Sequence, residues 1–146
     1  MLKVMIVEDN VLLADIVEDY LVGMSYEVCG IATSIAEAVA MADHHTPDLA
    51  VMDYRLSNGE LGSKIRSLVR DGDKMGILFV SGDTLTDRLT SREGDAFMQK
   101  PYSMAELAKA LSIVHEIKTG VEVVVSTFPR TFGLLKPPIL FAPVLP

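Results

Sequence analysis

Short apolar runs alternate with amphipathic helical patterns five times along the first 119 residues. Each run has the length of a strand, and each intervening pattern repeats apolar residues at helical spacing. Strands that alternate with helices in this way form βαβ units around a parallel sheet. The runs are almost wholly apolar, as in sheets that helices cover on both faces. We therefore expect an α/β fold, a doubly wound five-stranded parallel sheet with helices on both faces.

The boundaries of these elements follow from the runs and from helix-start signals. We expect strands at residues 3–7, 26–32, 49–53, 77–81 and 96–99. We expect helices at about residues 11–22, 34–44, 61–70, 85–93 and 103–118, of which the fourth is weak and polar. Ser34 with Glu37, and Ser103 with Glu106, have the spacing of a capping box at the start of the second and fifth helices.

Residues 120–146 break this pattern. They contain five of the seven prolines and only three charged residues, so a long helix is excluded. An apolar segment of this kind should not stay in water. We expect the segment to pack either on its own domain, residues 1–119, or on a dimer mate. Residues 121–125 could form a strand.

The composition narrows the class of partner. The net charge of −7 repels phosphate backbones, so we expect no direct nucleic-acid binding. The only cysteine, Cys29, can form no internal disulfide, which fits a reducing cytosol. No secretory signal and no apolar stretch long enough to span a bilayer is visible, so we expect a cytoplasmic protein without a membrane partner.

Ionisable residues follow three of the predicted strands. Glu8 and Asp9 come after the first strand, Asp53 ends the third, and Lys100 follows the fifth. The carboxyl ends of parallel strands meet at one edge of a sheet, where open α/β sheets bind ligands. Three carboxylates and one ammonium group at that edge make a site for a hard divalent cation and a phosphoryl group.

Magnesium fits this set of residues because it prefers oxygen ligands and usually keeps several waters. We expect Asp9 and Asp53 to be direct Mg²⁺ ligands, Glu8 to orient a bound water, and the backbone carbonyl of Arg55 to be a further ligand. An aspartate can also attack phosphorus and form an aspartyl-phosphate. The metal then neutralises charge on the phosphoryl oxygens during transfer.

The order Glu8-Asp9, Asp53, Ser81 and Lys100-Pro101 on successive strand ends resembles a two-component response-regulator receiver domain, over about residues 1–119. The resemblance implies a flavodoxin-like, CheY-like fold with strand order 2-1-3-4-5. It implies that Asp53 accepts a phosphoryl group from a histidine kinase or a phosphotransfer protein and that Mg²⁺ is required. Lys100 would pair with a phosphoryl oxygen and Ser81 would donate its hydroxyl to another.

The resemblance also implies a switch. An aromatic residue shortly before the lysine changes rotamer with phosphorylation in this family, and Phe97 matches that position. The chain departs from the usual pattern in carrying Ser57 where a proline is frequent, and in a short stretch between Ser81 and Lys100. Most receivers precede a long output domain, and nothing that long follows here, so we expect output through contact with a downstream protein.

Arg55 and Asp83 each lie two residues beyond a site residue. We hypothesise that they meet across the mouth of the site and restrict the access of water to the acyl-phosphate, which would slow its hydrolysis.

Other functions compete with this one. A phosphatase with an aspartyl-phosphate intermediate usually has a general acid two residues beyond its nucleophile, and that position is Arg55, which cannot donate a proton usefully. We therefore expect a phosphoacceptor with slow autodephosphorylation and not an enzyme. The chain could also be an interaction module with a vestigial pocket, dimerising through its tail as a swapped arm does. Asp9 with Asn10 could simply cap the following helix.

Overall fold

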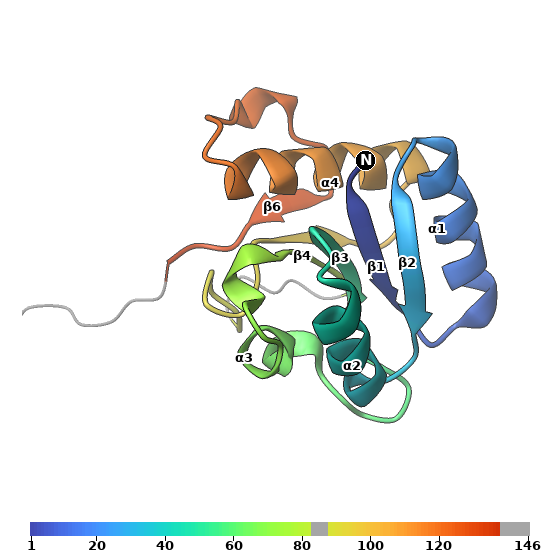
Figure 1. Cartoon of the computed structure of the whole chain (residues 1–146). Coiled ribbons are helices and arrows are strands. Elements are labelled where there is room, and N and C mark those ends of the chain that lie inside the picture. Colours follow the sequence, from blue (N-terminus) through green and yellow to red (C-terminus); the bar gives the residue numbers. More distant parts are fainter. Residues whose placement is uncertain (83–87, 138–146) are drawn as a thin grey trace, which may run out of the picture.

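Six strands form one sheet in a computed structural model of the chain, which describes residues 1–82 and 88–137. The strands are β1 Lys3–Val7, β2 Glu27–Ala32, β3 Leu49–Asp53, β4 Gly76–Ser81, β5 Ala96–Gln99 and β6 Phe132–Leu134. Their order is β2-β1-β3-β4-β5-β6, in which the first five are parallel and β6 is antiparallel to β5. The predicted order of the first five strands is confirmed, and a sixth strand extends the sheet (Figure 1).

Helices cover both faces of the sheet, as predicted. They are α1 Val11–Gly23, α2 Ile35–His45, α3 Ile65–Leu68 and α4 Met104–Lys118. Successive strand side chains point to opposite faces, so Val4 and Ile6 pack with α1 and α4, whereas Met5 and Val7 pack with α2 and α3. Each face therefore has its own apolar core. No helix in the two described ranges is long and apolar enough to cross a bilayer.

Side-chain caps fix where the helices begin. The capping box of α4 is complete, because Ser103 accepts from the N–H of Glu106 and Glu106 accepts from the N–H of Ser103. Only half of the box predicted for α2 forms. Ser34 caps the helix, but the carboxylate of Glu37 accepts from the N–H and hydroxyl of Thr33.

The predicted helix over residues 61–70 is mostly wrong. A short 3₁₀-helix, η1 (Gly62–Lys64), is followed by the single helical turn of α3. The side chain of Arg66 turns inward and donates to the carbonyl oxygens of Gly72 and Met75, at 3.2 and 2.8 Å. The chain therefore leaves the helix after Leu68 and turns back toward β4.

The fourth predicted helix, residues 85–93, finds no support in its described part. Residues 83–87 lie outside the described residues, and residues 88–93 form turns instead of a helix. Glu93 accepts from the N–H of Thr90, and the N–H of Ser91 donates to the carbonyl of Lys136 at 2.8 Å. These hydrogen bonds use backbone groups in ways that a helix would not allow.

The C-terminal segment also differs from expectation. Residues 121–125 are not a strand, and a 3₁₀-helix, η3 (Val125–Thr127), begins at the last of them. The strand of this segment is β6, which pairs Phe132 with Met98, Gly133 with Phe97 and Leu134 with Ala96. It forms there because β5 offers an unpaired edge and because Phe132 is buried beside α4. Residues 138–146 lie outside the described part of the chain.

Candidate functional site

Four predicted residues meet at the carboxyl edge of the sheet. Glu8 and Asp9 follow β1, Asp53 is the last residue of β3, and Lys100 follows β5. One carboxylate oxygen from each of the three acidic residues lies within 4.8 Å of the others. The Nζ of Lys100 lies 3.4 Å from Oδ2 of Asp53. This cluster of three oxygen donors could hold a divalent cation with an ammonium group beside it.

The cluster opens to solvent through a hollow of about 570 Å³. The hollow is lined by Glu8, Asp9, Asn10, Leu13, Asp53, Arg55, Leu56, Ser57 and Lys100. The side chain of Asp53 is 13% exposed, and that of Lys100 is 37% exposed. A phosphodonor can thus reach the exposed part of the Asp53 carboxylate from the hollow, while most of the Asp53 side chain is enclosed.

The acidic residues of the cluster differ in their electrostatics. Burial, followed by the hydrogen bond and negative charge of Asp53, raises the pKa of Glu8 to about 7, and Lys100 opposes this shift. Hydrogen bonds from the hydroxyl and then the backbone N–H of Ser57 lower the pKa of Asp9. Asp9 therefore carries its charge without a metal, whereas Glu8 is poised to take up or lose a proton near neutral pH.

The backbone after β1 and β3 holds the carboxylates in place. The side chain of Asn10, and not that of Asp9, caps α1 by accepting from the N–H of Leu13 at 3.1 Å. The N–H of Arg55 donates to Oδ1 of Asp53 at 3.3 Å. The Asp9 carboxylate is therefore not used as the helix cap and belongs to the acidic cluster. One carboxylate oxygen of Asp53 is oriented by the loop that follows β3.

Ser81 lies beside the lysine. It is the buried last residue of β4 and pairs in register with Gln99, and its backbone carbonyl accepts from the N–H of Lys100 at 2.9 Å. Phe97 lies two residues before Gln99 and is 9% exposed. Its ring lies under β6, so closely that a Cβ on Gly133 would be 2.5 Å from Cζ of Phe97.

The predicted gate is only partly described. The guanidinium of Arg55 lies over the ring of Tyr54, 5.6 Å from its centroid. Asp83 lies outside the described residues, so the pairing of Arg55 with Asp83 stays a prediction. The carbonyl of Arg55 as a metal ligand also stays a prediction.

Two further residues of the site were not predicted. Ser57 holds Asp9 by hydrogen bonds. The sequence signal for this role was a serine at a position where proline is frequent, because proline has no N–H to donate. Tyr102 lines a small cavity with Glu8, Asp53 and Lys100. Burial and the charges of Glu8 and Asp53 raise the pKa of Tyr102 to about 12. Only its closeness to Lys100 in the sequence could have indicated it.

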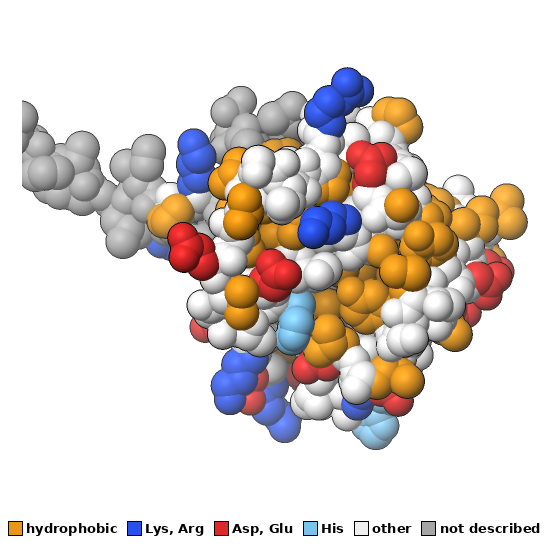
Figure 2. All heavy atoms as spheres, turned by 90° about the horizontal axis from the view of Figure 1, so that it is seen from above, with side chains coloured by type: hydrophobic (Ala, Val, Ile, Leu, Met, Phe, Trp, Pro, Cys, Tyr) orange, Lys and Arg blue, Asp and Glu red, His pale blue; other side chains and the backbone are white. Residues whose placement is uncertain are grey.

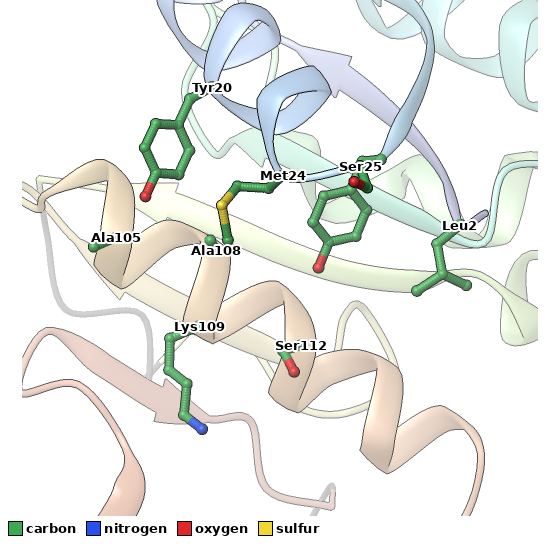
Figure 3. Close-up of a pocket in the computed structure, with 9 residues that line it drawn as sticks. Leu2, Tyr20, Met24, Ser25, Ala105, Ala108, Lys109 and Ser112 are labelled. Atoms are coloured by element: carbon green, nitrogen blue, oxygen red, sulfur yellow. The ribbon is translucent and has the colours of Figure 1, made fainter.

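A second hollow, of about 540 Å³, lies between α1 and α4 and shares no residue with the acidic one (Figure 3). Tyr20 and Met24 line it from α1 and the loop after it, and Ala105, Ala108 and Lys109 line it from α4. Figure 2 shows hydrophobic side chains gathered on the side of the molecule where α1 lies. The hollow is mostly apolar, and no carboxylate among the described residues lines it.

Comparisons with known proteins agree with this geometry. A family model described as the response regulator receiver domain matches residues 4–112. The regulatory protein VanR of Enterococcus faecium is 34% identical over 108 residues, which cover 72% of this chain and 46% of VanR. The transcriptional regulatory protein PdtaR of Mycobacterium tuberculosis is 29% identical over 114 residues, which cover 76% of this chain and 55% of PdtaR. The chain thus spans about half the length of these curated relatives.

Solved structures show the same fold. The non-phosphorylated HemR receiver domain from Leptospira biflexa superposes with a TM-score of 0.67 at 26% identity. The superposition covers 79% of this chain and 94% of that domain. The likeness is therefore to nearly the whole of the HemR domain.

Proposed function

The chain belongs to the response regulator receiver domain family, and we propose that it is the phosphoacceptor switch of a two-component phosphorelay. Asp53 takes a phosphoryl group from the phosphohistidine of a histidine kinase or phosphotransfer protein. The phosphorylated chain then acts through contacts with a downstream protein.

One observation supports this proposal above the others. The Asp53 carboxylate lies 3.4 Å from the Lys100 ammonium and within 4.8 Å of the Glu8 and Asp9 carboxylates, at the floor of an open hollow. A structural ion pair needs one carboxylate, whereas two more beside it cost electrostatic repulsion unless a cation joins them. The arrangement fits Mg²⁺, which takes hard oxygen ligands.

The transfer step follows from these groups. A carboxylate oxygen of Asp53 forms a bond to phosphorus as the bond from phosphorus to the donor's imidazole nitrogen breaks, and the imidazole takes up a proton. Asp9 and Asp53, with Glu8 through a bound water, would hold Mg²⁺, which would supply charge neutralisation for the phosphoryl oxygens. Lys100 moves its hydrogen bond from Asp53 to one phosphoryl oxygen, and the Ser81 hydroxyl donates to another.

The output of the switch is a protein contact. Phosphorylation replaces the single negative charge of the Asp53 carboxylate with about −1.5 to −2 charges on the phosphoryl group, and the net charge of −7 supports a protein partner over a nucleic acid. Ser81 in β4 and Phe97 in the adjacent β5 transmit the change in charge and hydrogen bonding at Asp53 to these two strands.

Incubation with a small acyl phosphate and Mg²⁺ tests the proposal. We expect intact-mass analysis to show a gain of one phosphate, lost on removal of Mg²⁺ and absent in Asp53→Asn. Equal phosphate uptake by Asp53→Asn would show that another residue is the acceptor.

We further propose that Arg55 and Asp83 restrict the access of water to the acyl-phosphate and so slow its hydrolysis. We expect Arg55→Ala and Asp83→Ala each to shorten the lifetime of the phosphorylated chain several-fold, measured by intact mass against time. Arg70→Ala, an exposed arginine outside the crevice, serves as the matched control. Unchanged lifetimes in both gate variants would contradict the gate.

A further inference from the structure

The edge of β5 is occupied by a segment that lies beyond the matched family region. The family model ends at residue 112, and β5 would be the last strand of the sheet without β6. An unpaired strand edge is a template for adding another extended segment. Residues 131–136, here called the strap, fill this edge, and β6 in Figure 1 is the central part of the strap.

The strap follows β5 in antiparallel register. The N–H of Gln99 donates to the carbonyl of Thr131 at 2.8 Å, and the N–H of Leu135 donates to the carbonyl of Asp95 at 3.0 Å. Beyond β5, the carbonyl of Lys136 accepts from Ser91 at 2.8 Å. The backbone hydrogen bonds of the strap therefore depend on extended shape and register, which any strand can supply.

The side chains of the strap give the edge its specificity. Gly133 lies over the ring of Phe97, where a Cβ would approach Cζ to 2.5 Å and Cε1 to 2.7 Å. Phe132 packs edge-on against Phe128, with ring centroids 5.0 Å apart, in the core on the α4 side. Leu135 is buried in the opposite core. The edge thus accepts a glycine opposite Phe97 with large apolar residues on either side.

The anchors of the strap lie next to the phosphoacceptor site. Gln99, which holds Thr131, immediately precedes Lys100, whose Nζ contacts Asp53. The hydroxyl of Thr131 also donates to Oε2 of Glu106, which caps α4 six residues after Lys100. A displacement of Lys100 toward a phosphoryl group therefore acts on the two groups that hold the first residue of the strap.

We propose that the edge of β5 is a docking site for an extended segment of a partner protein, and that phosphorylation of Asp53 opens it. The partner segment has a glycine that faces Phe97 and large apolar residues before and after it. The strap fills the edge until Asp53 is phosphorylated. The opening step rests on the proposed function, whereas the docking site does not.

The covalent link between the strap and α4 explains why a partner can bind the edge of β5 only after the strap is released. The strap is joined to α4 by residues 119–130, so its effective concentration at the edge is on the order of millimolar. A partner segment at cellular concentration competes poorly against that value. Weakening the hold of Gln99 and Glu106 on Thr131 removes the advantage of the strap.

The docking site is tested with a labelled synthetic peptide of residues 128–137 and the full-length chain. Gly133→Val in the chain forces its own strap away from Phe97, so we expect the peptide to bind this variant at least tenfold more tightly than the natural chain. The same peptide with Gly133→Val should bind neither. Ser126→Val places the same valine side chain at an exposed position outside the strap, five residues before it begins, and should behave as the natural chain.

Circular dichroism establishes that each variant is folded. If Gly133→Val is not folded, Leu135→Pro replaces it, because proline removes the N–H that bonds to Asp95. Equal peptide affinity of the natural chain and a folded strap variant would overturn the docking site.

Opening is tested by adding the acyl phosphate and Mg²⁺ to the natural chain, with intact mass measured on the same sample. We expect the peptide affinity to rise about tenfold as the phosphorylated fraction rises. Full phosphorylation with no change in affinity would overturn control by Asp53. Absence of phosphorylation would overturn the proposed function, while the Gly133→Val result still decides the docking site.

Discussion

Glu8 is the residue of the crevice whose protonation responds most to its surroundings. Its pKa of about 7 reflects burial beside the negative Asp53, without a bound metal. Because this folded-state pKa lies above the usual glutamate pKa of 4.5, the contribution of Glu8 to stability is full below pH 4.5 and is lost as the pH rises through about 7. Mg²⁺ binding reverses the preference, since a cation favours the ionised carboxylate.

We therefore predict that Mg²⁺ affinity depends on pH through Glu8. Between about pH 8 and about pH 6, protons compete with the metal and the affinity falls about tenfold. Calorimetric titration across this range measures the effect, with Glu8→Gln as the variant that removes it. The same slope in Glu8→Gln would mean that another group takes up the proton.

Ser57 sets the charge of Asp9 through two separate hydrogen bonds. We predict that Ser57→Ala, which removes the hydroxyl, raises the pKa of Asp9, and that Ser57→Pro, which also removes the N–H, raises it further. Titration of the Asp9 carboxyl followed by NMR distinguishes the two variants. An Asp9 pKa that stays low in Ser57→Pro would show that the hydrogen bonds do not matter.

The sequence alone allowed Glu8, Asp9, Asp53 and Lys100 to be grouped, because each lies directly at the end of an apolar strand. The packing of Tyr102 and the hydrogen bonds of Ser57 could not be predicted in this way. Both depend on loop conformations, which the pattern of apolar residues does not determine.

At the scale of elements, strands were easier to predict than the helices on the α3 side. The first five strands lie within one residue of their predicted bounds, because buried parallel strands are short and wholly apolar. The prediction for residues 61–70 failed because the pattern of apolar residues does not indicate the burial of the Arg66 side chain. It is 6% exposed and directed toward the chain ahead of it.

Arg66 joins three elements at the amino end of the sheet. It pairs with Asp95 just before β5, and Asp95 also forms an ion pair with Lys118 at the end of α4 and accepts from the N–H of Ile77 in β4. The Arg66 and Asp95 side chains are 5% and 9% exposed. Removing Arg66 leaves Lys118 as the counter-charge of Asp95. It also takes the Arg66 donor from the carbonyls of Gly72 and Met75, and loss of one partner of a buried ion pair is strongly destabilising.

We predict that Arg66→Met lowers the free energy of unfolding by about 3 kcal/mol. The exposed Arg70, four residues later, provides the control Arg70→Met, for which we expect a change within about 0.5 kcal/mol. Urea unfolding followed by circular dichroism measures both. Equal stability of the two variants would mean that the buried pair contributes no net stabilisation.

At the scale of the whole molecule, the chain places its acidic crevice and its strap at neighbouring parts of one sheet. The apolar character of residues 120–146 was apparent from the sequence, but the position of their strand was not. Residues 121–125 have strong β propensity and still form no strand, whereas residues 132–134 pair with β5. Pairing depends on the free edge and on the fit of Gly133 to Phe97, both of which are tertiary properties.

The central claim is that Asp53 accepts the phosphoryl group, and chemical trapping tests it most directly. After incubation with the acyl phosphate and Mg²⁺, borohydride reduces an aspartyl-phosphate to homoserine, and peptide mass mapping locates the modified residue. We predict homoserine at position 53 alone, and none when Mg²⁺ is removed. Homoserine at another acidic residue, with Asp53 unmodified, would contradict the account.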